Sequence, residues 1–121
     1  LLIARLLGDR LSAFVDAALE IGLEPLVEVH NRGEMERALA TGANLIGINN
    51  RNLETMTVDL STTVRLARAA RDAGRTVVSE SGIAWPYDVR RLSRHCDAFL
   101  IGSALMSAKD RQKRLEGFVF A

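Results

Sequence analysis

Four apolar segments of the chain each end in polar residues whose types could carry chemistry. The four endings are Glu28-Val29-His30, Asn49-Asn50-Arg51-Asn52, Ser79-Glu80-Ser81-Gly82 and Gly102-Ser103. If the segments are parallel strands, these endings meet at one edge of a sheet, where parallel α/β proteins place their functional sites. Two carboxylates, several amides and an arginine at one edge predict a site for a small molecule.

Glu28 and Glu80 are the candidate acid or base groups. Glu28 lies between two valines, so the alternation of a strand turns its side chain to the face opposite theirs. A carboxylate enclosed on that face loses solvation, which raises its pKa unless a cation or hydrogen-bond donors compensate. This placement makes Glu28 a candidate general base or acid. Glu80 follows Val77-Val78 in the same way, and for both glutamates a structural ion pair is the alternative interpretation.

The two serine–glycine pairs, Ser81-Gly82 and Gly102-Ser103, are candidates for binding a phosphate. Glycine lets the backbone approach a ligand closely, and (β/α)8 barrels commonly bind phosphate with the loops after their last two strands. Arg51 could hold a carboxylate in a bidentate pair, although a lone loop arginine is more commonly solvated. At least one of the neighbouring asparagines is expected to be only a turn residue.

Several other polar side chains are interpreted as structural. His30 is expected to hold the backbone of its loop. His95 and Cys96 precede a strand, at the sheet edge opposite the predicted site, and one cysteine beside one histidine is not a metal site. The basic run Lys109–Arg114 is expected to be a solvated helix face, and Trp85 is expected to lie at the surface or to pack on a helix.

Short apolar segments alternate along the chain with longer amphipathic segments, which indicates strands alternating with helices. The predicted strands are Leu1–Leu7, Pro25–His30, Asn44–Asn49, Thr76–Glu80 and Ala98–Gly102. The predicted helices are Ser12–Ile21, Gly33–Ala40, Ser61–Ala73, Trp85–Arg94 and Asp110–Phe120. The i, i+3, i+4, i+7 spacing predicts that the inner face of the first helix is Phe14, Ala17, Ala18 and Ile21. Ser61 is the predicted N-cap of its helix.

The alternation predicts an α/β fold. Strands joined through helices by short connections pair in parallel through right-handed crossovers. Two architectures satisfy this pattern: an open, doubly wound sheet, or part of a closed (β/α)8 barrel.

Length and composition limit the classes of function. The chain has 121 residues, 48% hydrophobic and 26% charged, which suits one packed domain or part of one. Its net charge of +1 gives no case for nucleic acid or a membrane surface as a partner, and no apolar run reaches the ~20 residues of a membrane span. One cysteine and no signal peptide predict a reducing, cytoplasmic location. The chain begins at Leu1 without a methionine, as a piece of a larger protein would.

Four segments, in order and with matching spacing, closely resemble the indole-3-glycerol phosphate synthase family. They are Glu24–His30, Gly47–Thr55, Ser79–Ile83 and Leu100–Met106, and the opening Leu1-Leu2-Ile3 is similar to the family's fourth strand. The resemblance covers essentially all 121 residues. It implies the carboxyl-terminal portion of a (β/α)8 barrel, in which residues 1–121 form five β/α units, strands four to eight, with no second domain.

The resemblance implies an activity on a small phosphorylated substrate. The family closes the ring of 1-(2-carboxyphenylamino)-1-deoxyribulose 5-phosphate with loss of carbon dioxide and water, a step of tryptophan biosynthesis that uses no cofactor and no metal. Carried over by motif, Glu28 and Asn49 are catalytic, and Glu28 is the general base of the dehydration. Asn49 and Arg51 lie around the anthranilate and hydroxyl groups, and Glu80 lies in the same pocket. The remaining assignments are phosphate binding by Ser81, Gly82, Gly102 and Ser103 and apolar pocket walls formed by Leu1 and Leu100.

The chain departs from the family pattern in its lysines. The family's general acid is a lysine on strand three, and a second lysine lies on strand one. The only lysines here, Lys109 and Lys113, match neither, so we expect the chain alone to be inactive. Two hypotheses follow: part of a synthase, or a non-catalytic phosphate-binding half-barrel or engineered scaffold. Five strands leave two open sheet edges, through which the chain could self-associate.

Overall fold

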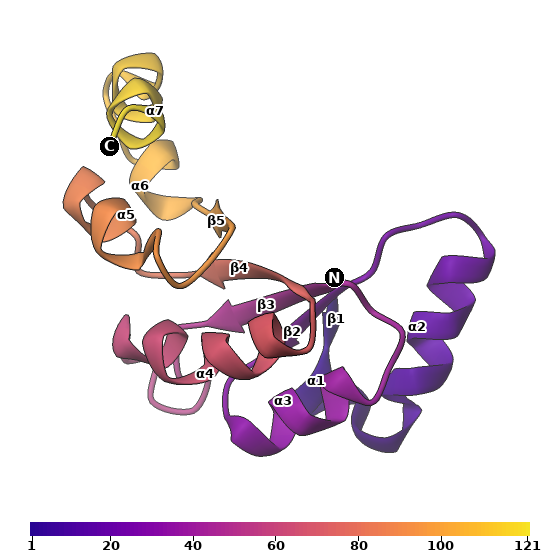
Figure 1. Ribbon diagram of the computed structural model, residues 1–121. Coiled ribbons are helices and arrows are strands. Elements are labelled where there is room, and N and C mark those ends of the chain that lie inside the picture. Colours follow the sequence, from indigo (N-terminus) through magenta and orange to yellow (C-terminus); the bar gives the residue numbers. More distant parts are fainter.

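Five short apolar segments pair into one parallel sheet in the computed structural model, which describes residues 1–121 (Figure 1). The strands are β1 (Leu2–Ile3), β2 (Leu26–Val29), β3 (Leu45–Asn49), β4 (Thr76–Glu80) and β5 (Ala98–Leu100). The helices are α1 (Ala4–Leu7), α2 (Leu11–Glu20), α3 (Arg32–Leu39), α4 (Ser61–Asp72), α5 (Pro86–Leu92), α6 (Ser103–Met106) and α7 (Arg111–Val119), with a 3-10 turn at Gly8–Arg10. The predicted α/β class is therefore confirmed.

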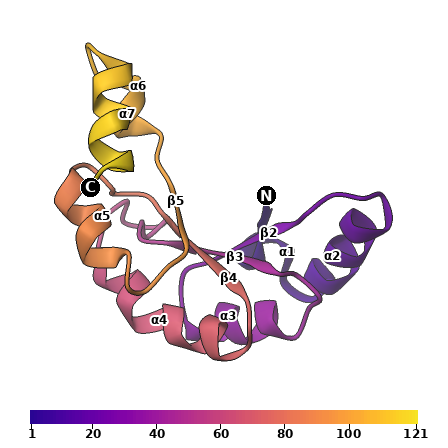
Figure 2. The same cartoon turned by 45° about the horizontal axis from the view of Figure 1, so that its top comes forward.

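The strand order distinguishes between the two predicted architectures. The strands lie in the order β1-β2-β3-β4-β5, and every neighbouring pair is parallel. A doubly wound sheet reverses its order at a switch point and carries helices on both faces, whereas right-handed crossovers that always advance in one direction keep the helices on one face. Figure 2 shows α3 and α4 on one side of the central strands and no helix over their other side. The sheet is an arc of a (β/α) barrel.

The two faces of this arc carry different residues. Alternate positions of the central strands are fully buried beneath the helices: Val27, Val29, Ile46, Ile48 and Val77. The open face carries Glu28, Gly47 and Val78 in one row across the sheet. The next row consists of Asn49, Glu80 and Leu100. The open face, which lines the inside of a complete barrel, therefore collects the polar strand residues.

The first predicted strand, Leu1–Leu7, is mostly wrong. Only Leu2–Ile3 pairs with β2, and the chain then turns directly into α1. Because β1 is an edge strand with one neighbour, pairing does not hold the segment extended beyond Ile3. Gly8 ends α1 in the left-handed region with φ 52°, and its N–H donates to the carbonyl of Ala4.

The predicted inner face of the helix Ser12–Ile21 is also wrong. The buried residues of α2 are Leu11 and Val15, whereas Phe14 and Ile21 are 44% and 75% exposed. The helix begins one residue earlier than predicted, and Leu11 with Val15, spaced i, i+4, forms the stripe that reaches the core.

The other predicted elements agree with the structure to within two residues at each end. The N-cap of α4 is an exception, because Leu60 and not Ser61 occupies that position, and the side chain that binds the start of the helix is that of Asp59. The Oδ1 atom of Asp59 accepts hydrogen bonds from the backbone N–H of Ser61 at 2.9 Å and from its hydroxyl at 2.6 Å. The short helix α6 was not predicted. The longest helix, α4, has 12 residues, and none of the helices could span a membrane.

Candidate active site

Two glutamates from β2 and β4 lie close together on the open face of the sheet. Glu28 is 6% and Glu80 2% exposed. Gly47 of β3 lies between their strands, paired with Glu28 in the register, and a Cβ at this position would overlap Oε1 of Glu80. Glycine thus provides the space in which the Glu80 carboxyl lies, although the sequence analysis assigned Gly47 no role.

The environment of Glu80 favours its neutral form. Burial and, after it, the neighbouring carboxylate of Glu28 raise the pKa of Glu80 to about 8. The Oε1 atom of Glu80 also has no hydrogen-bond partner in the chain. A carboxyl group held in its neutral form beside a second carboxyl group is an arrangement that can both donate and accept a proton.

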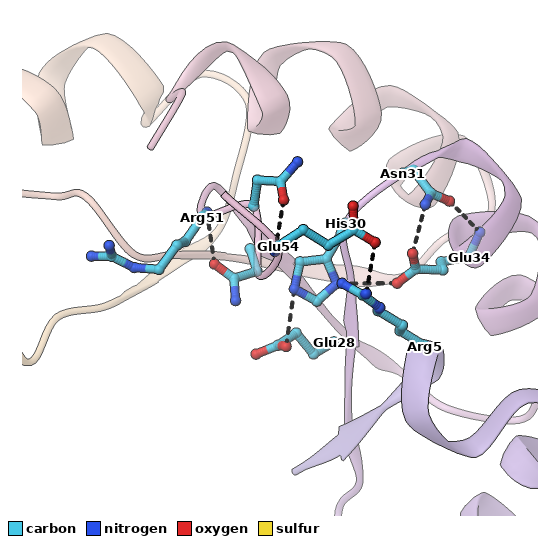
Figure 3. A network of polar contacts seen from close by, with 9 residues as sticks. Arg5, Glu28, His30, Asn31, Glu34, Arg51 and Glu54 are labelled. Atoms are coloured by element: carbon cyan, nitrogen blue, oxygen red, sulfur yellow. Dashed lines mark hydrogen bonds and ion pairs between the residues drawn. The ribbon is translucent and has the colours of Figure 1, made fainter. Parts of the chain in front are cut away.

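Glu28 has a second neighbour, His30 (Figure 3). His30 Nε2 lies 3.3 Å from Glu28 Oε2, and its Nδ1 lies 3.1 Å from Glu34 Oε1. The expectation that His30 holds its loop backbone is wrong, because the imidazole bridges two carboxylates instead.

The start of α3 fixes Glu34 in this position. Asn31 is the N-cap of α3: its Oδ1 accepts from the Glu34 backbone N–H at 2.9 Å, and its Nδ2 donates to Glu34 Oε2 at 2.6 Å. Asn followed three residues later by Glu is the sequence pattern of a reciprocal helix cap. That pattern could have located Glu34, and with it the partner of His30.

Asn49 and Arg51 form a local turn at the end of β3. Asn49 Oδ1 accepts from the Arg51 backbone N–H at 2.9 Å, which is an Asx-turn. The Arg51 guanidinium donates from Nη1 to the carbonyl of Met56 at 3.0 Å, and it forms no ion pair within the chain. Its remaining donors are therefore free for a carboxylate.

A cavity of about 570 Å³ brings most of the predicted site residues together. Its lining includes eight of them: Glu28, Arg51, Glu80, Ser81, Gly82, Leu100, Gly102 and Ser103. Asn49 lines a second, more polar cavity of about 560 Å³, which also includes His30 and Arg51. Leu1 is 68% exposed and lines neither cavity, so the structure does not bring this predicted pocket wall to the site.

Backbone N–H groups of both serine–glycine segments remain without partners. Ser81 and Gly82 have positive φ values of 68° and 78°, and a Cβ on Gly82 would overlap Val58. The backbone N–H groups of Gly82 and Gly102 donate to no other atom of the chain. Free N–H groups on backbone that lines a cavity are suited to an anion.

A buried polar network supports the first of these segments. The amide of Asn50, 2% exposed, donates to the Ser81 carbonyl at 3.0 Å and to the Ser79 hydroxyl at 3.1 Å, and it accepts from the Thr63 hydroxyl at 2.8 Å. Ser79 and Thr63 share a further hydrogen bond of 2.7 Å. At least one asparagine of this loop was expected to be only a turn residue, and nothing local in the sequence indicated the partners of Asn50.

Arg114 of α7 also reaches the cavity, which corrects the expectation that the run Lys109–Arg114 is only a solvated face. Its guanidinium stacks on Trp85 at 4.4 Å from the ring centroid and donates to the carbonyl of Ala84 at 3.0 Å. This contact holds α7 against the segment that follows β4.

A one-sided arc of parallel strands, with carboxyl groups and unpartnered backbone N–H groups at their carboxyl ends, defines the chain as part of a (β/α) barrel. The family model of indole-3-glycerol phosphate synthase matches residues 1–118, and the chain belongs to this family. It is 44% identical over 120 residues to an indole-3-glycerol phosphate synthase of Thermoanaerobacter sp. (strain X514), covering 98% of this chain and 46% of that protein. It is 45% identical over 116 residues to one of Streptococcus pneumoniae (strain CGSP14), covering 96% of this chain and 45% of that protein. The chain thus spans about half the length of these curated relatives.

Proposed function

We propose that the chain carries part of the active site of an indole-3-glycerol phosphate synthase. The reaction is the ring closure of 1-(2-carboxyphenylamino)-1-deoxyribulose 5-phosphate with loss of carbon dioxide and water. The observation that carries this proposal is that the Glu28/Glu80 pair and both serine–glycine segments line one cavity. A substrate with an aromatic carboxylate at one end and a phosphate at the other needs a cation for the first and anion-binding N–H groups for the second, and Arg51 and the two serine–glycine segments line this cavity together with the carboxyl pair.

The carboxyl pair is suited to the dehydration. In that step a base removes a proton from the ring-closed intermediate while its hydroxyl group leaves as water. Glu28 takes the proton, and Glu80, whose pKa is raised by burial, hydrogen-bonds to the oxygen that leaves; that oxygen receives its proton from the general acid that the resemblance places outside this chain.

The two ends of the substrate have separate binding groups in this proposal. The free guanidinium donors of Arg51 bind the anthranilate carboxylate, because bidentate pairing is the geometry in which arginine binds carboxylates most strongly. Asn49 orients Arg51 through the Asx-turn. The N–H groups of Gly82 and Gly102 bind the phosphate, and Leu100 contacts the aromatic ring.

The proposed reaction also requires groups outside this chain. Lys109 and Lys113 are exposed and line neither cavity that contains Glu28 or Arg51, so neither can act as the general acid that the resemblance implies.

The decisive experiment separates binding from turnover. We expect this chain to bind indole-3-glycerol phosphate but not to form it. Chemical-shift changes of the Gly82 and Gly102 amides measure the binding. Joined to the part of the Thermoanaerobacter relative that it does not match, the chain should form the fluorescent indole product, and Glu28→Gln should abolish that turnover. Binding without turnover in the joined protein would favour the non-catalytic phosphate-binding hypothesis.

A further inference from the structure

We propose that His30 is a positioning residue for Glu28: its imidazole, held by Glu34, orients the Glu28 carboxyl group for its role as the base. This inference rests on the proposed role of Glu28 as the base. It concerns a residue that does not line the cavity containing Glu28 and Glu80.

The first argument is the geometry of the imidazole (Figure 3). The His30 side chain is 11% exposed and lies between Glu28, 8% exposed, and Glu34, 6% exposed. One ring nitrogen faces each carboxylate, at 3.3 Å and 3.1 Å. Because either ring nitrogen can carry a proton, the imidazole can donate to Glu28 from Nε2 while Nδ1 keeps the ring oriented against Glu34.

The second argument is that Asn31 holds Glu34 in place, and Glu34 in turn contacts His30. Asn31 binds both the backbone N–H and the carboxylate of Glu34 as the cap of α3. Glu34 is therefore fixed to the helix terminus, and the imidazole takes its orientation from Glu34. The contact between His30 and Glu28 is the weaker of the two, because His30 Nε2 lies within ion-pair distance of Glu28 but makes no hydrogen bond. Catalytic contacts of this kind commonly tighten when substrate binds.

The third argument is the asymmetry between the two glutamates. Glu28 has an imidazole within 3.3 Å, whereas Glu80 forms no ion pair and has an unpartnered oxygen. The nearby arginines do not compensate this difference: Arg5 pairs with Glu54 at 2.8 Å, and Arg51 donates to the carbonyl of Met56. The chain therefore gives Glu28, and not Glu80, an imidazole that can orient its carboxyl group.

The test is steady-state kinetics of matched variants of the joined protein, in which this chain is combined with the unmatched part of the Thermoanaerobacter relative. We expect His30→Ala to lower kcat roughly 10- to 100-fold while KM changes less than about 3-fold, because only the orientation of the base is lost. His30→Gln, whose amide can still donate to Glu28, should recover most of that loss. Glu34→Gln keeps the shape of the cap and should lower kcat in the same direction. His95→Gln alters the only other histidine and should leave kcat unchanged.

Each outcome bears on a different claim. If Glu28→Gln abolishes turnover while a folded His30→Ala protein keeps its kcat, the inference is wrong and the proposed function stands. If Glu28→Gln itself leaves turnover unchanged, the proposed function fails. If His30→Ala and His30→Gln lose the same activity, or if KM rises in place of a fall in kcat, His30 does not position Glu28.

Carboxyl carbon NMR provides a readout that does not depend on activity. The signal of the protonated carboxyl group should disappear in Glu80→Gln and shift in His30→Ala. An unchanged signal in His30→Ala would overturn the inference.

Discussion

Gly47 and Glu80 fit together across neighbouring strands, because the Glu80 carboxyl lies where a side chain at position 47 would begin. The residue in register with Gly47 on the other side is Glu28. A glycine in the middle of the central strand therefore allows two carboxyl groups from β2 and β4 to approach each other across β3.

Gly47→Ala tests this relationship. The added Cβ would overlap Oε1 of Glu80 and lies 3.3 Å from Leu26, so the carboxyl group must move. We expect a loss of about 1–3 kcal/mol in the free energy of unfolding, as for other overpacked positions, together with a large fall in kcat of the complete enzyme. Urea denaturation measures the first effect.

Gly33→Ala is the matched control. Gly33 lies in α3, and its added Cβ would meet only Asn31 Oδ1, at an ordinary 3.6 Å. Alanine there should be neutral or stabilising by roughly 0.5–1 kcal/mol, since it is the better helix former. Equal stability of the Gly47→Ala and wild-type proteins would show that Glu80 does not need this space.

The raised pKa of Glu80 predicts a stability that falls as pH rises. In the folded chain Glu80 keeps its proton up to about pH 8, whereas its ordinary value is 4.5. The folded state thus binds the extra proton between these values, so the stability from this group is complete below about pH 4.5 and is lost as pH rises through about 8. Glu80→Gln is neutral throughout and should lack this dependence.

The measurement is chemical denaturation of both proteins at acid and at alkaline pH. Relative to wild type, Glu80→Gln should gain roughly 1–2 kcal/mol between about pH 5 and about pH 8.5, a range that allows for screening on the open face of the sheet. Glu20→Gln, at an exposed position of α2, should show no such gain. Parallel curves for wild type and Glu80→Gln would contradict the raised pKa.

The sequence predicted the α/β fold and most of the cavity because both depend on repeated local patterns, whereas the barrel was implied only by the family resemblance. Apolar strand segments alternate with amphipathic helices, and the carboxyl ends of parallel strands meet at one edge, so the strand endings alone group Glu28, Arg51 and Glu80, which line one cavity. Strand order could not be predicted this way, since both architectures share the same alternation. Edge effects were also missed, as in the segment Leu1–Leu7, where one neighbouring strand does not sustain pairing.

Two kinds of residue could not be recognised from the sequence: those whose hydrogen-bond partners are distant in the chain, and a glycine whose lack of a side chain leaves space for another group. Asn50 binds Thr63 and Ser79, 13 and 29 residues away, and Gly47 matters for the carboxyl group that occupies its space. His30 is different, because its partner Glu34 lies four residues away. The capping pattern Asn31–Glu34 was present in the sequence and was not interpreted.

Gly82→Ala tests the phosphate-binding backbone against a control with the same strain. Both Gly82 and Gly74 have positive φ, 78° and 73°, but a Cβ on Gly82 would overlap Val58, whereas one on Gly74 would meet nothing within 4 Å. Gly74→Ala should lose about 1 kcal/mol through left-handed strain alone. Gly82→Ala should lose more than this and should also weaken phosphate-ligand affinity. Equal losses with unchanged affinity would separate Gly82 from the anion site.

Asn50→Ala tests how far the buried network determines the geometry of the Ser81 segment. The substitution removes the amide that binds the Ser81 carbonyl and the Thr63 backbone N–H, and it leaves the hydroxyls of Ser79 and Thr63 with only each other. Buried groups left unsatisfied cost more than the net value of a hydrogen bond, so we expect about 2–4 kcal/mol of lost stability.

Asn52→Ala is the control. It removes an exposed turn asparagine whose side chain binds only the N–H groups of Glu54 and Thr55, and it should cost about 0.5–1 kcal/mol. Because Asn50 holds Ser81 and Asn52 does not, only Asn50→Ala should weaken binding of indole-3-glycerol phosphate, measured by calorimetry at a temperature where both variants are folded. Equal affinity of the two variants would mean that the phosphate-binding segment keeps its conformation without the network.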